Sequence, residues 1–249
     1  FPYRFGPFSF ISYHDKRRLT DLGLLRSASD FQLNTETSYL SELEPLDQKA
    51  LVELKQTGLR GNRLVRKTYL EHPQFAARSE ILEQLFNPQE IKHLQTTWNT
   101  DQTPIIFTTG YEGLTIDAFL NRLIAHNIML VVDVRNNPQS MKYGFSKRMF
   151  REYLEKAGIQ YIHIPELGIP SALRKGLGTS ISVEQLFIKY ATDLLPQQAE
   201  AMAQLENLIA TCPRLALVCF EADHRMCHRH TLVEYLEKEN TLVKPVVHL

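Results

Sequence analysis

From Pro104 onward, short apolar segments alternate with segments whose apolar residues recur at helical spacing. The short segments have the length and composition of strands, and they cover residues 105–109, 129–134, 161–164, 214–220 and 243–249. The segments with helical spacing cover residues 115–125, 146–157, 183–190, 198–210 and 228–238. Strands that alternate with helices predict an α/β fold, a mostly parallel Rossmann-like sheet with helices on both faces.

The first hundred residues follow a different, mainly helical pattern. Apolar residues at helical spacing predict a helix over 10–22 that stops at Gly23. Further helices are expected over 47–54 and 78–85, and residues 30–34 have the composition of a short strand. The pair Asn87-Pro88 is expected to break the helical pattern, and the polar stretch 92–103 is the predicted linker. Residues 1–100 and 104–249 are therefore the two expected domains, and an earlier helix is expected to precede Phe1.

Composition and charge exclude several classes of protein. Apolar residues make up 43% of the chain and charged residues 22%, which is ordinary for a protein that buries a core. The formal net charge is zero, so no global field indicates a nucleic-acid or membrane partner. The three cysteines are an odd number without a disulfide spacing, which favours a reducing compartment and predicts a cytoplasmic protein. No apolar segment is long enough to span a bilayer, and the N-terminus lacks a secretion signal.

Polar residues gather where the predicted strands end, which is the edge at which open parallel sheets bind ligands. They are Gly110, Tyr111, Glu112, Asp133, Arg135, Glu166, Cys219 and Glu221. The last strand segment leads into a charged loop, and Cys227-His228-Arg229 then opens a helix. Positive side chains and free amides at a helix N-terminus predict an anion site.

Several of these residues have a plainer structural interpretation. Asp133 and Arg135 either grip a ligand together or form a buried ion pair, and Glu112 either acts on a substrate or favours the helix dipole. His163 on a strand is typical of a satisfied core histidine, and Cys219 at a strand end is typical of packing. Cysteines and histidines of the C-terminal loop offer zinc ligands, but no Cys-x-x-Cys pair is present, so neither a metal nor another cofactor is predicted. The residues considered for zinc are Cys219, His224, Cys227, His228 and His230.

The order of these motifs resembles the domain-of-unknown-function family four-eight-eight over about residues 104–240. The motifs are Thr109-Gly110-Tyr111-Glu112, Asp133-Val134-Arg135 with Pro138 and Ser140, Phe145-Ser146, the stretch 161–168, Cys219-x-Glu221 and Cys227-His228-Arg229. The chain departs from the family at Tyr111-Glu112, where members often carry His-Ser. The resemblance implies the fold and the place of the site, and it leaves the reaction open.

The N-terminal stretches 1–9 and 13–19 resemble phage-associated antitoxin-like winged-helix proteins. This resemblance implies a winged-helix-like module that binds nucleic acid or protein. Basic side chains of the module would contact phosphates if the partner is nucleic acid. They are Arg17, Arg18, Arg63 and Lys67, with a solvated basic helix face as the alternative.

These observations predict an enzyme that acts on a nucleotide or on a base in nucleic acid. Arg135 and Arg229 would bind phosphate, and Asp133 or Glu221 would activate water, with Glu112 as a further catalytic carboxylate. The expected reaction is hydrolytic, such as cleavage of the N-glycosidic bond of an extruded base. One alternative is a non-catalytic DNA-binding regulator that senses a nucleotide. Another is nucleophilic chemistry at Cys219 or Cys227.

Overall fold

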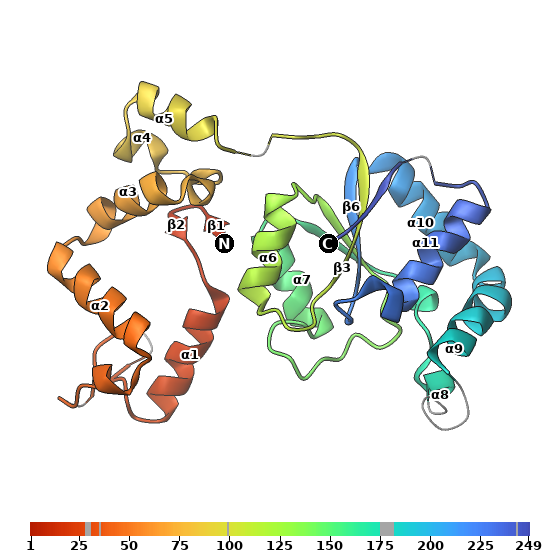
Figure 1. Cartoon of the computed structure of the whole chain (residues 1–249), viewed down its shortest axis with the longest axis horizontal. Coiled ribbons are helices and arrows are strands. Elements are labelled where there is room, and N and C mark those ends of the chain that lie inside the picture. Colours follow the sequence, from red (N-terminus) through yellow and green to blue (C-terminus); the bar gives the residue numbers. More distant parts are fainter. Residues whose placement is uncertain (28–30, 35, 99, 175–181, 243) are drawn as a thin grey trace. The chain divides into compact units, whose positions relative to one another are not determined.

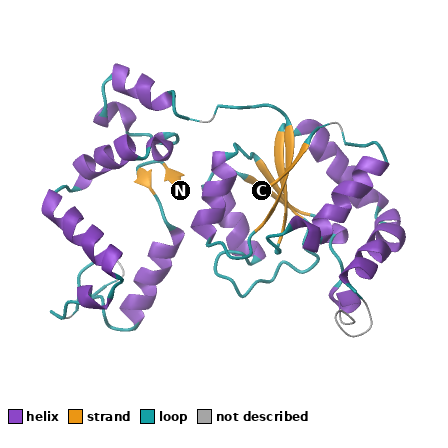
Figure 2. Cartoon of the chain, in the orientation of Figure 1, coloured by secondary structure: helices purple, strands orange, loops and turns teal. Residues whose placement is uncertain are grey.

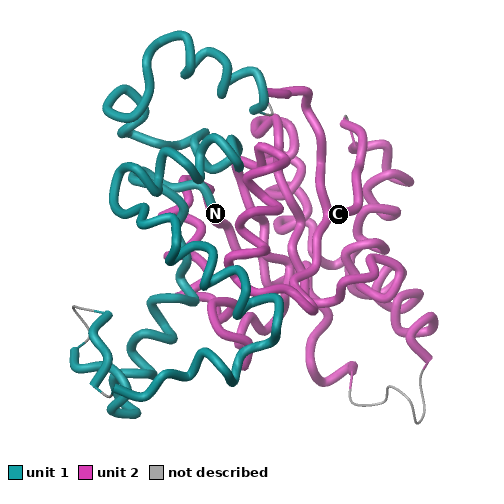
Figure 3. The backbone as a smooth tube through the Cα atoms, turned by 60° about the vertical axis from the view of Figure 1, so that its left-hand side comes forward, with its two compact units in different colours: residues 1–98 teal, residues 99–249 magenta. Residues whose placement is uncertain are grey.

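Two separate units make up the structure, a computed structural model that describes residues 1–27, 31–34, 36–98, 100–174, 182–242 and 244–249. Unit 1 is Phe1–Trp98 and unit 2 is Asn99–Leu249 (Figure 3). The boundary between the units falls inside the stretch 92–103 that the sequence indicates as a linker.

Unit 1 is mainly helical, as the sequence predicts. Its helices are α1 (Phe10–Asp21), α2 (Pro45–Thr57), α3 (Gly61–Glu71), α4 (Leu82–Leu85) and α5 (Pro88–Gln95) (Figure 1). The short strands β1 (Pro2–Tyr3) and β2 (Gly6–Pro7) pair antiparallel before α1. Ser9 begins α1 by accepting a hydrogen bond from the amide of Ser12, which satisfies one of the free amides of the first turn.

Three predictions for unit 1 are wrong in detail. Of the expected strand 30–34, only Leu33 forms a bridge, to Leu25, and residue 30 lies outside the described residues. The helix expected over 78–85 is reduced to α4. Asn87-Pro88 begins α5 instead of breaking the pattern, because Asn87 caps the amide of Glu90 and Glu90 caps the amide of Asn87. Proline suits the first helical turn, where its missing N–H has no partner to lose.

Unit 2 contains a five-stranded, all-parallel sheet, which confirms the predicted α/β class. The strand order is β5 (Gln160–His163), β4 (Leu130–Asp133), β6 (Arg214–Cys219), β3 (Ile105–Gly110), β7 (Val246–His248). Helices α6 (Ile116–Ala125) and α7 (Lys147–Lys156) cover one face, and α10 (Ala199–Thr211) and α11 (His228–Lys238) cover the other (Figures 1 and 2). The remaining helices are α8 (Ser171–Arg174), α9 (Val183–Lys189) and a π-turn, Tyr190–Leu194.

The sheet is covered on both faces, so its three inner strands β4, β6 and β3 are buried along almost their whole length. Leu215 and Leu217 of β6 lie in one buried cluster with Leu205 of α10 and Leu232 of α11. The predicted strands and helices of unit 2 agree with the observed ones to within one residue at each end, apart from the last strand. The expected strand 243–249 is paired only over Val246–His248, and residue 243 lies outside the described residues. Within the described part of the chain, no helix has the length and apolar composition needed to cross a membrane.

Candidate functional site

The loop that follows β6 is held at the carboxyl edge of the sheet by contacts from β3 and α11. Gly110 ends β3 directly beneath this loop, since a Cβ at this position would lie 1.7 Å from the carbonyl oxygen of Glu221. Arg229 donates hydrogen bonds to the carbonyl oxygens of Glu221 (2.6 Å) and Ala222 (3.0 Å). Glu112 accepts a hydrogen bond of 2.9 Å from the amide of Ala222. Three residues predicted to handle a substrate thus hold the loop that carries Glu221.

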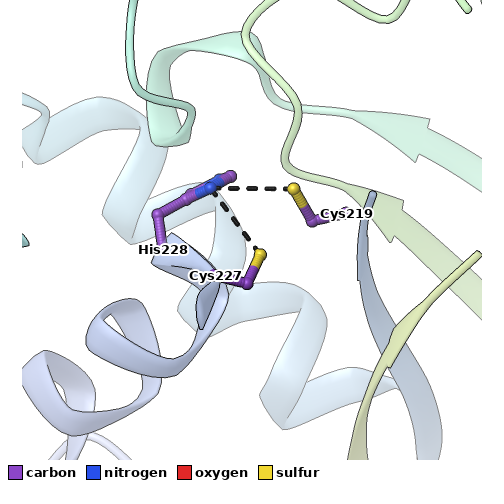
Figure 4. Close-up of side chains that lie close together, drawn as sticks. All are labelled: Cys219, Cys227 and His228. Carbon is purple, nitrogen blue, oxygen red and sulfur yellow. Dashed lines mark hydrogen bonds between the residues drawn. The ribbon is translucent and has the colours of Figure 1, made fainter. Parts of the chain in front are cut away.

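Two thiols and one imidazole meet at the end of β6 (Figure 4). Cys219 is the last residue of β6, Cys227 precedes α11, and His228 begins that helix. Nδ1 of His228 lies 3.6 Å from Sγ of Cys219 and 3.9 Å from Sγ of Cys227. All three side chains are buried, with exposed fractions of 2%, 1% and 2%. Their sulfur and nitrogen atoms lie within 4.8 Å of one another, which makes them a candidate metal centre.

The orientation of His228 is set by a backbone carbonyl on its far side. Nε2 of His228 lies 3.0 Å from the carbonyl oxygen of Val134, directly after β4. A carbonyl oxygen only accepts hydrogen bonds, so Nε2 carries the ring proton and donates it. In the neutral ring, Nδ1 is therefore unprotonated and presents its lone pair to the two sulfur atoms. A histidine ligand of a metal ion is oriented in the same way by a second-shell acceptor.

Glu221 adds a carboxylate to the two thiols and the imidazole. Sγ of Cys219 donates to Oε2 of Glu221 at 3.3 Å. Burial by itself would raise the pKa of Glu221, but hydrogen bonds, the first of them from Cys227, hold it below its usual value. Burial also raises the pKa of the Cys227 thiol, and the neighbouring Cys219 adds to the effect. The metal-free centre therefore pairs a protonated Cys227 thiol with a carboxylate, which is unlike an activated cysteine nucleophile.

The predicted ligand-gripping pair Asp133 and Arg135 forms a closed internal network. Arg135 donates to both carboxylate oxygens of Asp133, at 2.8 and 2.6 Å, and also to the hydroxyl of Tyr111 and the carbonyl oxygen of Phe145. Tyr161 donates a further hydrogen bond of 2.7 Å to Asp133. Asp133 is fully buried and Arg135 is 5% exposed. The geometry thus matches the alternative of a buried ion pair.

The predicted phosphate clamp by Arg135 and Arg229 receives no support from these contacts. Arg229 is fully buried, and its two terminal nitrogens donate to the loop carbonyls described above. Both guanidinium groups donate to acceptors within the protein: Arg135 to Asp133, as in the ion-pair alternative, and Arg229 to backbone carbonyls that the sequence pattern does not indicate. Asp133 is likewise enclosed by its partners and is poorly placed to activate water.

The other predicted site residues lie apart from the thiol–imidazole cluster or are exposed. Glu166 is exposed and helps to line a cavity of about 490 Å³ together with residues at the start of α10. His163 is satisfied on both sides, by Lys147 at 2.8 Å and by the carbonyl oxygen of Arg135 at 2.8 Å, as expected for a core histidine. In unit 1, the predicted nucleic-acid contacts Arg17, Arg18 and Arg63 are exposed, whereas Lys67 pairs with Glu71.

The histidines and cysteines that the sequence groups together separate into two clusters. Cys219, Cys227 and His228 form the first, whereas His224 and His230 join His248 of β7 in a second. His228 and His230 are two positions apart on one helix and therefore point to different sides of it. Nothing in local spacing indicates His248, because its proximity to His224 arises only when β7 pairs with β3.

One family comparison matches the region that carries this geometry. No curated protein and no solved structure was found to match the chain. Residues 115–236 match the family described as Domain of unknown function DUF488. This region includes α6, the strand ends that hold Asp133 and Cys219, and the start of α11 at His228. The part of unit 2 from α6 to Leu236 of α11 is therefore similar to the DUF488 family, in the region where the order of motifs predicts it.

Proposed function

We propose that the DUF488-like part of unit 2 binds a zinc-like divalent metal ion through Cys219, Cys227 and His228, with Glu221 as the fourth ligand. The observation that carries the proposal is that Nδ1 of His228 faces two buried sulfur atoms while Nε2 faces a backbone carbonyl. Two sulfur ligands, one nitrogen and one oxygen suit the tetrahedral coordination that zinc prefers in proteins.

Burial distinguishes this proposal from cysteine nucleophile chemistry. A nucleophilic thiol must reach its substrate and be deprotonated, whereas both cysteines here are at most 2% exposed. A metal ion would replace the thiol protons and be enclosed by its ligands, which is the arrangement of a structural zinc site. The metal would then tie the end of β6 to the start of α11. Because thiolate ligands require reduced cysteines, we place the protein in the cytoplasm.

The test is cobalt substitution of tag-free protein prepared under reducing conditions. Thiolate ligands give bound Co²⁺ an intense charge-transfer absorption, so the wild-type protein is expected to show this band. Cys219→Ser combined with Cys227→Ser should abolish it. Cys212→Ser is the matched control and should keep the band, because Sγ of Cys212 contacts the carbonyl of Arg214 outside the cluster. A wild-type protein without the band, or a double variant that keeps it, contradicts the proposal.

A nucleic-acid-directed hydrolase is the second candidate function. Zinc deaminases of nucleobases bind their metal through histidine and cysteine ligands and use a glutamate that is not a ligand as the acid–base group. Glu221 stands beside the same combination of ligands here, and it would take that role if the metal keeps a position for water. Base-releasing glycosylase chemistry would instead use Glu221 to activate the water that replaces the base at the sugar carbon. A domain that binds nucleic acid without turnover would instead be a regulator.

Glu221→Gln separates these possibilities. Single-stranded and duplex DNA with normal or modified bases would be assayed for base release and for deamination. An enzyme is expected to lose product formation in Glu221→Gln while it keeps the cobalt band. If the wild-type protein binds DNA and forms neither product, the catalytic candidate is rejected in favour of the regulator.

Unit 1 supplies the nucleic-acid contacts in this second candidate, as a winged-helix-like module. What supports it is the exposure of three arginines on two helices, Arg17 and Arg18 on α1 and Arg63 on α3. Removing one phosphate-binding charge should lower the slope of log affinity against log salt by about 0.9 for duplex DNA. Replacing all three arginines by alanine should thus flatten the slope, and Lys67→Ala should change it less because Lys67 already pairs with Glu71. An unchanged slope in the triple variant would refute this binding surface.

A further inference from the structure

A second cluster of metal-ligating side chains lies on the other side of α11. His224 of η6 (His224–Met226), His230 of α11 and His248 of β7 each bring one ring nitrogen within 4.8 Å of the other two. The ring centroids of His224 and His230 lie 5.0 Å apart, and those of His230 and His248 lie 5.7 Å apart. We propose that these three histidines form a metal site of their own, for a divalent ion such as Zn²⁺, Co²⁺ or Ni²⁺.

His230 has a nitrogen that the protein leaves unsatisfied. Within the described part of the chain, Nδ1 of His230 is buried and has no hydrogen-bond partner. A buried polar atom without a partner destabilises the fold, and a bound ion would satisfy it. Nε2 of the same ring lies 3.6 Å from a carboxylate oxygen of Glu234, one helical turn further along α11. A carboxylate behind the ring and a vacant lone pair in front of it are the arrangement of a metal-binding histidine.

His248 is oriented by the sheet. Residue 248 is in register with Thr108 of the neighbouring strand β3, and Oγ1 of Thr108 lies 2.7 Å from Nδ1 of His248. This hydrogen bond leaves Nε2 of His248 as the nitrogen that can bind an ion. Thr108 is fully buried, so its hydroxyl is a fixed partner. Thr108 is thus a positioning residue for the site.

The rings of His224 and His248 must separate when the ion binds. They are stacked with centroids 3.8 Å apart and planes at 4°. A metal ion lies near the plane of each imidazole that binds it, so two stacked rings cannot both coordinate until one of them turns. His248 is held by Thr108, and the ring of His224 is therefore the one expected to rotate.

The chemistry of this site would differ from that of the cysteine centre. Three imidazole ligands leave a tetrahedral ion one position for water, and such an ion lowers the pKa of that water towards neutrality. His224 and His230 are half-buried and His248 is exposed, so solvent reaches the cluster. His230 also helps to line a cavity of about 470 Å³ between α9 and α11, with room for a small molecule. The histidine cluster is therefore the better placed of the two centres for hydrolysis.

The test uses tag-free full-length protein carrying Cys219→Ser and Cys227→Ser, so that only the histidine cluster remains. Equilibrium dialysis is expected to give about one Co²⁺ bound per chain, with a spectrum that lacks thiolate charge transfer. Adding His224→Ala or His248→Gln should remove this ion, and Thr108→Val should weaken its binding by about tenfold, as loss of an outer partner does. His93→Ala, an exposed histidine of unit 1, is the matched control and should bind as before.

Imidazole NMR signals give a second measurement that does not depend on stoichiometry. Opening the stack on addition of Zn²⁺ should shift the ring signals of His224 and His248, because each ring leaves the other's ring current. The proposal is overturned if the Cys219→Ser, Cys227→Ser variant binds no ion, or if adding His248→Gln to it leaves the binding unchanged. Failure of the cysteine centre would appear separately, as a missing thiolate band in the wild-type protein.

Discussion

Asp133→Asn tests whether the pair Asp133–Arg135 serves the fold. The change keeps the shape of the side chain but removes the negative charge beside a guanidinium that is 5% exposed. Breaking a buried ion pair by neutralising one partner typically costs about 3–5 kcal/mol, because the remaining charge stays buried without compensation. Arg135 keeps its hydrogen bonds to Tyr111 and to the carbonyl of Phe145, so we expect the low end, about 3 kcal/mol.

Urea unfolding of the full chain can assign this loss to unit 2. The chain has 1 tryptophan, Trp98, which lies in unit 1, so tryptophan fluorescence follows unit 1 and circular dichroism follows both units. With a urea dependence of about 2 kcal/mol per molar, the unit 2 transition should move down by about 1.5 M. The fluorescence transition of Trp98 should not move.

A double variant separates the charge effect from loss of packing. Asp133→Asn with Arg135→Met removes both charges, and it should be more stable than Asp133→Asn alone. Tyr161→Phe, which removes one hydrogen bond to the carboxylate, should cost about 1.5–3 kcal/mol. If Asp133→Asn shifts the transition by less than about 0.5 M, or if the double variant is the less stable of the two, the pair does not stabilise the fold in this way.

Three further predictions concern the loop after β6. Gly110→Ala should lower the free energy of unfolding in urea by about 1–3 kcal/mol and weaken the cobalt band, because the new Cβ would collide with the backbone of Glu221. A variant with the wild-type unfolding free energy and cobalt band would contradict this close approach. Arg229→Lys should also weaken the band, since the shorter lysine lacks the planar fork whose two nitrogens reach the carbonyls of Glu221 and Ala222, and an unchanged band would remove Arg229 from loop positioning. Burial raises the pKa of Cys227 above its unfolded value, so its contribution to stability is complete below about pH 8.5 and declines as pH rises further. Metal-free wild-type protein should thus lose urea resistance between about pH 8.5 and 10, and the loss should be smaller in Cys227→Ala.

The local hydrophobic pattern predicted most helices and strands of unit 2 correctly. It failed where the same residues were compatible with two different structures. Apolar segments such as 130–132 and 215–219 form inner strands because burial on both faces leaves no place for polar alternation. The pair Asn-Pro is typical both of the end of a helix and of its start. Here Asn87 and Glu90 cap each other, so Pro88 begins α5. Glu90, three residues after Asn87, is the signal in the sequence that could have shown this helix start.

For the candidate site, the sequence predicted which loops are involved but not which side chains contact one another. The order of motifs indicated which loops reach the sheet edge, since the carboxyl ends of parallel strands share one edge. It did not decide between a ligand grip and an ion pair for Asp133 and Arg135. It also did not indicate that Arg229 would bind loop carbonyls, or that the histidines would divide into two clusters with His248 in the second. The sequence shows which side chains each strand or helix carries, because hydrophobic periodicity depends only on residues that are close together in the chain. Strand order and loop crossing determine which atoms come within bonding distance, and those depend on contacts between residues far apart in the chain.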